Sequence, residues 1–506
     1  MSIRDKILIY CDFFPSSGVG HLKRCIVLAK ELYKRGLDPT FLISSNVGEP
    51  PIALPFHIER CSLNNKSILS AEEIIKLAYR DRVQTVIIDS YKISENWIPK
   101  LISANLTVVA IDDLGIAGNA TMRIDYSPNP KLITENCLNL LGPKYFLTDS
   151  TSKVYRSTTP QKIIAHAGSL GNFADAPIVY LTAARVFKTF GFEISWLSPN
   201  KVSYQWLEEN ELITDTEEII GWQKNNQEIW QEYDIVLGPA GTSLFEAILQ
   251  GALPISFPIS KTQTSDRNTW LALGHCLHLT SDEVSNDDII KKIVHLSLNN
   301  YQLFQDLLHE KSRDLDAKGT SRVADAIVNT ISNRAFDLVK PPKGNSGIRS
   351  CTISDAQNFL NARNAPYIRK LSIDDKHIIT WPEHVDWWLN KKSERFLIEE
   401  NGEIKAFFWH RTELTNEGDY LVGGWFPTKN RQSFGYAIRL LEWQLEYCNK
   451  TYKNHIWLAI ISKNNKAVLA LNRRYGFTDA TEPNRSVAKF LFPQLNEDFI
   501  ILQRRS

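Results

Sequence analysis

The feature that most constrains the fold is a regular alternation of short apolar runs with amphipathic segments through the first two thirds of the chain. Strands that are apolar along their whole length, and that alternate with helices, are typical of parallel sheets covered on both faces. The sequence therefore predicts a doubly wound α/β architecture. The predicted strands are 6–11, 39–44, 83–89 and 106–113 in a first set, and 162–168, 193–198, 233–241 and 252–258 in a second.

The two sets of strands predict two Rossmann-like lobes, residues 1–155 and 156–339, with a cleft between them. A helix is expected over Leu22–Arg35, ended by Gly36, and a helical stretch from Gln302 to about Ser332 closes the second lobe. The chain has 506 residues, which is too many for one ordinary core and agrees with more than one domain.

A linker and a third domain follow the two lobes. The segment "KPPKGNSG" holds two prolines and two glycines and few apolar residues, which predicts a linker at 340–346. Beyond it the composition becomes rich in tryptophan, and residues 395–410 form two apolar runs around Asn401-Gly402, a strong hairpin signal. Residues 347–506 are therefore expected to form a separate α+β domain.

The composition argues against several classes of binding partner. A net charge of +1 provides no general attraction for nucleic acid or an acidic membrane. No apolar stretch reaches about 18 residues, so no membrane span is expected, and the start of the chain is typical of a first strand and not of a signal peptide. The seven cysteines form no CxxC pair, which predicts no metal site and a cytoplasmic protein with reduced thiols.

A glycine-rich junction opens the first predicted helix. In "SSGVGHLKRC", Gly18 and Gly20 precede His21 between a strand and a helix. The free N–H groups of a helix start favour anions, and histidine titrates near neutral pH and is a good general base. The junction therefore predicts an anion site with a catalytic His21. A tight turn with a capping histidine remains an equal alternative at this stage.

A second junction repeats the pattern. In "GPAGTSLFEA", the residues Gly241, Thr242 and Ser243 would offer backbone and hydroxyl donors to a phosphate. Glu246, one turn on, would accept hydrogen bonds from a ribose diol, although a solvated helix carboxylate is the commoner outcome for such a residue. Two glycine-opened helices at one cleft suit a sugar nucleotide.

Several motifs in this order resemble a known family. The strings are "GVGHLKRCIVLAKEL", "IIDSYKI", "VVAIDDL", "LLGPKYFL" and "GPAGTSLFEAILQGALPI". Over about residues 1–335 they are similar to the UDP-sugar hydrolases of the pseudaminic acid pathway, which share the GT-B fold of a transferase that makes a peptidoglycan lipid precursor. The resemblance implies metal-independent hydrolysis of UDP-2,4-diacetamido-2,4,6-trideoxy-β-L-altropyranose, with water attacking the anomeric carbon and UDP leaving.

The resemblance also implies roles for individual residues. His21 matches the catalytic histidine that orients or deprotonates water, and Tyr91 matches a tyrosine near the sugar. The family's Asn-Gln pair falls on Thr262-Gln263 and its "GGSD" string on Ala167–Leu170, which are two departures from the pattern. The implied substrate-binding residues are Gly18, Gly20, Arg24, Asp89, Gly168, Gly241, Thr242, Ser243, Glu246 and Gln263.

The last domain resembles the GNAT acyltransferase superfamily. "RQSFGYAIRLLEWQLEY" follows a strand at 419–426 and fits the Q/R-x-x-G-x-G/A loop whose backbone N–H groups hold the pyrophosphate of coenzyme A. "NKAVLALNRRYGF" resembles the downstream N-x-x-A-x-x-L-Y-x-x-x-G-F pattern. The resemblance implies acetyl-CoA as co-substrate. The implied cofactor-binding residues are Gln432, Ser433, Phe434, Gly435, Tyr436, Ala437 and Asn465.

One position of the GNAT pattern differs. The usual tyrosine general acid falls on Asn472, which has no titratable proton, and Tyr475 is a weak substitute. Trp387, Trp388 and Trp409 would line a sugar pocket, although a packed aromatic core is favoured for such a group.

Together, the two resemblances predict a bifunctional enzyme of nonulosonate biosynthesis. The last domain would acetylate a UDP-4-amino sugar and the two lobes would remove UDP from the product. The expected partners are small molecules, a UDP-sugar and acetyl-CoA, with no metal. A GT-B glycosyltransferase fused to an acetyltransferase stays open, and so does a non-catalytic sensor of sugar nucleotide and acetyl-CoA.

Overall fold

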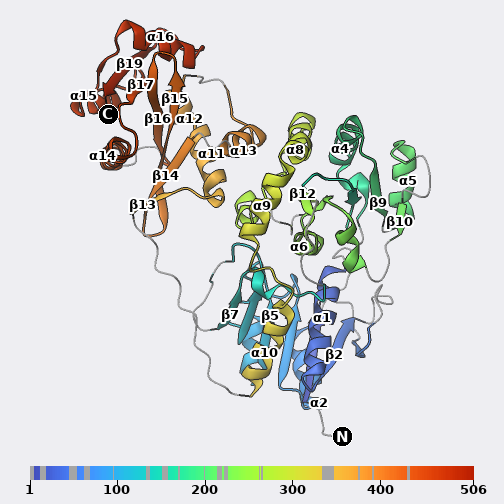
Figure 1. Ribbon diagram of the computed structural model, residues 1–506. Coiled ribbons are helices and arrows are strands. Elements are labelled where there is room, and N and C mark those ends of the chain that lie inside the picture. The colour runs from blue at the N-terminus through green and yellow to red at the C-terminus, as the bar shows by residue number, and fades with distance from the viewer. Residues whose placement is uncertain are drawn as a thin grey trace. The chain divides into compact units, whose positions relative to one another are not determined.

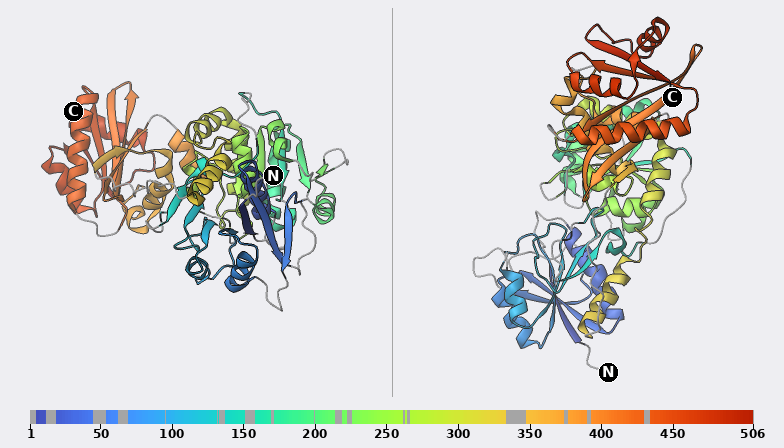
Figure 2. Two further views of the ribbon diagram at one scale, coloured as in Figure 1. Left: turned by 90° about the horizontal axis from the view of Figure 1, so that it is seen from below. Right: turned by 90° about the vertical axis from the view of Figure 1, so that its left-hand side faces the viewer.

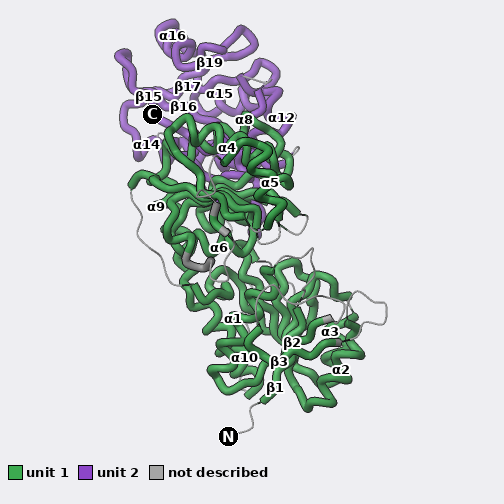
Figure 3. The backbone as a smooth tube through the Cα atoms, turned by 90° about the vertical axis from the view of Figure 1, so that its right-hand side faces the viewer, with its two compact units in different colours: residues 1–341 green, residues 342–506 purple. Residues whose placement is uncertain are grey.

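The computed structural model divides the chain into two compact units, residues 1–341 and 342–506 (Figure 3). The predicted lobe boundary near 155 and the predicted linker at 340–346 both lie outside the described residues. The residues that the structure describes are 5–11, 19–44, 54–61, 69–94, 96–130, 132, 137–150, 158–168, 171–198, 200–213, 219–221, 226–260, 263, 266–332, 347–373, 377–389, 393–429 and 434–505.

The first unit begins with a wholly parallel sheet in the order β3-β2-β1-β4-β5-β6-β7 (Figure 1). Its strands are β1 (Asp5–Cys11), β2 (Leu37–Ser44), β3 (His57–Cys61), β4 (Thr85–Asp89), β5 (Thr107–Ile111), β6 (Met122–Asp125) and β7 (Leu138–Leu141). Its helices are α1 (Gly20–Lys34), α2 (Ala71–Arg80) and α3 (Trp97–Ser103).

Helices cover this sheet on both faces (Figure 2). Successive strand residues point to opposite faces, so Leu8 and Tyr10 of β1 pack into one core with α2 and α3. The intervening Ile7 and Ile9 are fully buried toward the other face. Central strands that are buried on both sides account for the unbroken apolar runs in the sequence.

A second parallel sheet follows, in the order β10-β9-β8-β11-β12. Its strands are β8 (Ile163–His166), β9 (Ile194–Ser198), β10 (Ile219–Gly221), β11 (Ile235–Pro239) and β12 (Leu253–Phe257). The helices of this part are α4 (Pro177–Thr189), α5 (Lys201–Glu209), α6 (Thr242–Leu249), α7 (Arg267–Leu271), α8 (Asp287–Asn299), α9 (Tyr301–Lys311) and α10 (Gly319–Ile331).

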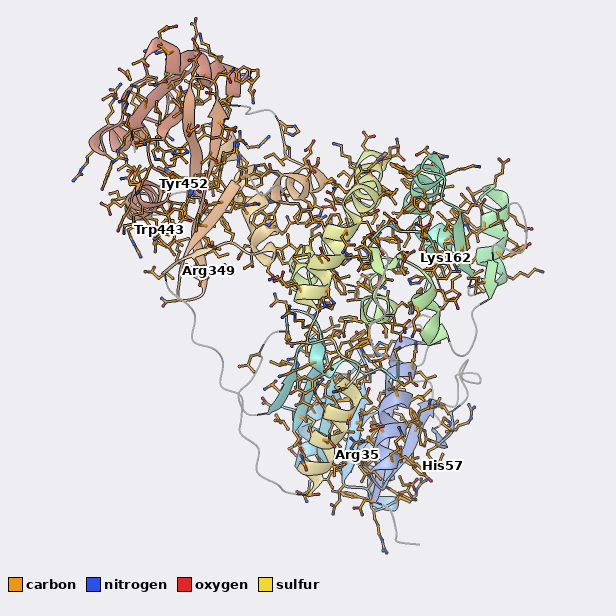
Figure 4. All side chains as sticks on the ribbon, in the orientation of Figure 1. Arg35, His57, Lys162, Arg349, Trp443 and Tyr452 are labelled. Carbon is orange, nitrogen blue, oxygen red and sulfur yellow. The ribbon has the colours of Figure 1, made fainter. Side chains whose placement is uncertain are left out.

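The helical stretch expected over 302–332 is two helices, α9 and α10, because the chain turns between them and Ala317 adopts a positive φ of 57°. After this turn α10 packs against α1, the first helix of the unit. Arg35, just past α1, donates to Ser321 Oγ at 2.8 Å and to Asp325 Oδ1 at 2.9 Å on α10 (Figure 4). The end of the unit therefore returns to its beginning.

The second unit is a mixed sheet in the order β13-β14-β15-β16-β17-β19-β18. Its strands are β13 (Gly347–Ser350), β14 (Ser393–Glu400), β15 (Glu403–Thr415), β16 (Gly418–Pro427), β17 (Ile456–Ser462), β18 (Thr478–Asp479) and β19 (Phe499–Arg505). Its helices are α11 (Ala356–Asn364), α12 (Pro366–Arg369), α13 (Trp381–Leu389), α14 (Phe434–Thr451), α15 (Lys466–Arg474) and α16 (Glu482–Leu491).

The predicted hairpin is confirmed in this unit. β14 and β15 pair antiparallel around Asn401 and Gly402, whose φ angles of 53° and 77° are the left-handed values that a two-residue hairpin turn requires. The predicted fold class is confirmed as well, since two parallel Rossmann-like sheets precede an α+β unit. All eight strands predicted for the two lobes of the first unit are present. Within that unit the sequence analysis missed β3, β6, β7 and β10, which are short and lie toward the edges of their sheets.

Candidate functional site

The first candidate site lies where β1 and β4 end. The register pairs Cys11 with Asp89, so the last residues of β1 and β4 lie side by side. His21 is the second residue of α1 and is 6% exposed. Its Nδ1 lies 2.6 Å from Oδ1 of Asp89, which is fully buried. Two residues 68 positions apart are thus held together at the carboxyl edge of the sheet.

Arg24, one turn along α1, fixes this carboxylate. Its Nε donates to Asp89 Oδ2 at 2.5 Å, its Nη2 donates to Oδ1, and its Nη1 donates to the Tyr126 hydroxyl at 2.5 Å. Burial alone would raise the pKa of Asp89, but the charge of Arg24 and the hydrogen bonds from Arg24 and His21 hold it well below its usual range. Asp89 is therefore ionised at neutral pH.

An ionised Asp89 decides which nitrogen of His21 carries the proton. His21 Nδ1 lies 2.6 Å from Asp89 Oδ1, which can only accept, and 3.0 Å from Arg24 Nη2, which can only donate; the shorter contact with the carboxylate favours the proton on Nδ1. In the neutral ring Nε2 then keeps a free lone pair, which is the arrangement of a general base held by an acidic partner. Tyr91 lies edge-on to the His21 ring, with centroids 4.7 Å apart, and its hydroxyl donates to Asp113 Oδ2 at 3.0 Å.

The start of α6 provides a second element of the site. Gly241, Thr242 and Ser243 are half-buried, and no acidic residue lies in the first turn of the helix. A Cβ placed on Gly20 would lie 3.3 Å from Thr242 Oγ1, so the starts of α1 and α6 are in contact. Gln263 also reaches this place, because its Nε2 would lie 3.6 Å from a Cβ on Gly241. The predicted diphosphate-binding residues are therefore next to the histidine helix.

Glu246 differs from the solvated helix carboxylate considered above. It is 3% exposed, and its Oε1 accepts from Lys23 Nζ at 2.6 Å. Trp230 Nε1 donates to its Oε2 at 3.4 Å. The buried carboxylate of Glu246 on α6 is thus paired with Lys23 on α1, and this ion pair joins the two parts of the unit. The sequence analysis did not single out Lys23.

Gly168 lies near a second buried histidine. The N–H of Gly168 donates to His166 Nδ1 at 3.1 Å, and burial lowers the pKa of His166 to about 3. A Cβ on Gly238 would lie 2.3 Å from His166 Nε2, so this ring requires glycine at the end of β11. Gly18, Thr262, Ser169 and Leu170 lie outside the described residues.

The second unit holds the other candidate site. Gly435, Tyr436 and Ala437 lie in the first turn of α14, whereas Gln432, Ser433 and the side chain of Phe434 are outside the described part. Asn465 caps α15 by accepting from the Val468 N–H at 3.4 Å. The Tyr436 hydroxyl donates to Glu400 Oε2 at 2.5 Å, so this side chain is engaged within the unit.

Two parallel strands diverge beside α14. β16 and β17 pair only from Tyr420 to Val422 and from Ile456 to Leu458, although β16 continues to Pro427 and β17 to Ser462. The next residues of β16 are Gly423 and Gly424, and a Cβ on Gly424 would lie 3.3 Å from Trp409 Nε1. Beyond Val422 the described residues of β16 and β17 thus no longer pair with each other, a feature that the sequence analysis did not identify.

The departures in the GNAT pattern have structural roles. Asn472 is 4% exposed and its Nδ2 donates to the Val468 carbonyl at 2.9 Å. The Tyr475 hydroxyl donates to Glu442, and this hydrogen bond raises the pKa of Tyr475. Trp387 and Trp388 pack with Phe359 and take the Arg395 guanidinium over their rings at 5.0 and 4.7 Å. These contacts agree with a packed aromatic core, which the sequence analysis favoured over a sugar pocket for these tryptophans.

Three residues of the first site escaped the sequence analysis. Asp113 is the last residue of the strand predicted at 106–113, within "IDD", which is a usable signal because strand ends face ligands in such sheets. Tyr126 and Lys23 gave no comparable signal, since their partners lie 102 and 223 positions away.

Within the described ranges no group of His, Cys, Asp or Glu side chains could hold a metal ion. No helix in that part of the chain is long and apolar enough to cross a membrane.

Comparisons with known proteins find only low sequence identity. No protein-family model matches the chain. An uncharacterised protein of Methanocaldococcus jannaschii, MJ1062, is 23% identical over 432 residues, which cover 79% of this chain and 82% of the relative. Because the match spans more residues than either unit contains, it includes part of both.

Solved structures resemble each unit separately. MurG of Acinetobacter baumannii covers 64% of this chain and 99% of its own, at 12% identity and a TM-score of 0.46. A ribosomal-protein-alanine N-acetyltransferase of Brucella melitensis covers 32% of this chain and 99% of its own, at 15% identity and a TM-score of 0.27. These likenesses concern the fold.

Proposed function

We propose that the first unit hydrolyses a UDP-sugar at its anomeric carbon, and that the second unit transfers acetyl from acetyl-CoA to a UDP-4-amino sugar. The observation that carries the first proposal is the His21–Asp89 pair, which makes Nε2 the basic atom of the neutral ring. The motif resemblance supplies the substrate class, a UDP-2,4-diacetamido-trideoxy sugar. The two activities would act in succession, with acetylation first.

In the proposed reaction His21 Nε2 takes a proton from water as the water oxygen bonds to the anomeric carbon. The bond from that carbon to the diphosphate oxygen breaks, and its electron pair leaves with UDP. Asp89 stays ionised throughout, because Arg24 holds its pKa low, and it stabilises the imidazolium that forms. The N–H groups at the start of α6 would hold the diphosphate, where the helix dipole favours negative charge.

The test is a His21→Ala variant of the full chain. Loss of a general base lowers rates by about 10²- to 10⁴-fold, so UDP release should fall by that factor while UDP binding stays nearly unchanged. UDP release is followed in a coupled assay and binding by calorimetry. A turnover close to that of the wild type would remove His21 from the mechanism.

The acceptor distinguishes hydrolysis from transfer. Incubation of the UDP-sugar with the protein and water alone releases UDP if the unit is a hydrolase. Release that requires an added hydroxyl acceptor would identify a glycosyltransferase instead. Binding of the UDP-sugar without any product in either assay would identify a sensor.

The second activity is supported by the diverging strands β16 and β17 beside the start of α14. A coenzyme placed between them would meet the edge of β16 that no longer pairs with β17 and the first N–H groups of the helix. Because Asn472 cannot give a proton to the departing thiolate, we expect tight binding of acetyl-CoA with modest transfer. Calorimetric titration of acetyl-CoA and mass spectrometry of a UDP-4-amino sugar check this, and a chain that does not bind acetyl-CoA would contradict it.

A further inference from the structure

The ion pair between Lys23 and Glu246 joins the two helix starts of the first unit. Lys23 lies in the first turn of α1 and Glu246 one turn into α6, and their charged atoms are 2.6 Å apart. The Glu246 side chain is 4% exposed and that of Lys23 is 26% exposed. Under the proposed function this same carboxylate would receive the ribose hydroxyls of UDP, so one of its partners must change when the nucleotide binds.

The place of the ammonium group follows from helix geometry. Glu246 is four residues after Thr242, which corresponds to about 6 Å along the helix axis. Gly20, in the same turn as Lys23, abuts Thr242. The Lys23 ammonium therefore lies within about one turn of the first N–H groups of α6, and a flexible four-carbon stem lets it turn toward them.

The other two basic side chains at the start of α1, His21 and Arg24, already have hydrogen-bond partners. Arg24 donates to both oxygens of Asp89 and to Tyr126, and His21 Nδ1 is bonded to Asp89. The described first turn of α6 carries no charged side chain. Of the three basic side chains at the start of α1, His21, Lys23 and Arg24, Lys23 is thus the one whose counter-ion a nucleotide would itself replace.

We propose that Lys23 is a diphosphate-binding residue, which exchanges Glu246 for the diphosphate of the UDP-sugar as Glu246 takes the ribose hydroxyls. This inference rests on the proposed function and adds a ligand to it. In the exchange, two charged groups that neutralise each other between the two helix starts each acquire a substrate partner. Neither is left buried without one, which would be costly for the carboxylate.

The experiment compares the affinities of UDP and uridine, which share the ribose and differ in the diphosphate. In Lys23→Gln the loss of a charge-assisted contact should weaken UDP by about tenfold or more and leave uridine within about twofold. Both ligands are titrated calorimetrically into the full chain. Lys23→Arg should restore most of the UDP affinity, and Lys30→Gln, on the same helix with a half-exposed side chain, should change neither affinity.

A double variant, Lys23→Gln with Glu246→Gln, guards against misfolding, because it removes both charges of the pair. In it the preference for UDP over uridine should fall as in the single variant. An unchanged preference in either variant, in a chain that still binds UDP, would overturn this inference and leave the proposed function standing. Wild-type protein that does not bind UDP would overturn both.

Discussion

Each sheet of the first unit has a buried histidine at its carboxyl edge, and the two rings carry their proton on opposite nitrogens. His21 donates from Nδ1 to the carboxylate of Asp89. His166, the last residue of β8, accepts at Nδ1 from the Gly168 N–H and so holds its proton on Nε2 in the neutral ring. In the neutral rings, His21 therefore has its lone pair on Nε2, whereas the lone pair of His166 is on Nδ1 and accepts from a backbone N–H.

The difference shows that the partner of an imidazole, and not its burial, decides what it can do. Both rings are almost excluded from solvent, at 6% and 2% exposure. A carboxylate stabilises the positive charge that a base acquires when it accepts a proton. A backbone N–H instead uses up the lone pair, and burial keeps His166 neutral with a pKa of about 3. His166 therefore serves packing, against Trp230 and under Gly238.

The largest expected effect on the free energy of unfolding comes from removing the negative charge of Asp89, the partner of His21 and Arg24. Asp89→Asn leaves the buried Arg24 guanidinium without its counter-charge, and removing one partner of a buried ion pair costs about 3–5 kcal/mol. We expect the free energy of unfolding of the first unit to fall by that amount. Urea denaturation of the full chain measures it, with hydrogen exchange in α1 identifying the transition of this unit.

Glu72→Gln is the matched control, because Glu72 pairs with Lys100 at 2.5 Å on the surface. Exposed pairs contribute little, and no measurable loss is expected. Equal losses in the two variants would show that burial of the His21–Asp89–Arg24 cluster has no special energetic weight.

A smaller change in the free energy of unfolding is expected when the pH is lowered, because His166 stays neutral in the folded chain. Its folded pKa is about 3 and the ordinary value is about 6.5. Between these values the unfolded chain binds a proton that the folded chain does not, so stability falls as the pH is lowered from about 6.5. The slope for one such group is at most about 1.4 kcal/mol per pH unit.

Comparison with His166→Gln isolates this contribution, because His275, whose pKa burial also lowers to about 3, adds a similar slope in both proteins. The difference in unfolding free energy between wild type and variant should shrink as the pH falls from 6.5 toward 4.5 and stay constant above pH 7. A constant difference across the whole range would mean that His166 does not stay neutral in the folded chain.

The smallest effect is expected at Tyr91. Its hydroxyl donates to Asp113, an exposed carboxylate, whereas the Tyr126 hydroxyl is buried and accepts from Arg24. Tyr91→Phe should therefore lower the unfolding free energy by less than about 1 kcal/mol, and Tyr126→Phe by about 1–3 kcal/mol. Thermal or urea unfolding of the two variants checks the order, and the reverse order would show that the Arg24 network does not need Tyr126.

Much of the architecture was predictable because its signals are local. The apolar runs at 6–11 and 83–89 are central strands buried on both faces, and the Asn401-Gly402 pair adopts the turn that its residue types favour. Edge strands such as β3, with the sequence HIERC, bury too little to leave an apolar run. The break between α9 and α10 was missed although Gly319, the first residue of α10, marks it in the sequence.

The sequence by itself determined the alternation of strands and helices, the glycine-opened starts of α1 and α6, and the identity of His21 as a histidine at a helix start. Only the tertiary structure decided the chemistry of that histidine, because its partner Asp89 comes from a strand 68 positions away and Arg24 sets the charge of that carboxylate. The same holds for Glu246, which meets Lys23 across 223 positions. Local patterns determine backbone conformation, whereas protonation states and ion pairs depend on burial and on neighbours that the folded chain alone brings together.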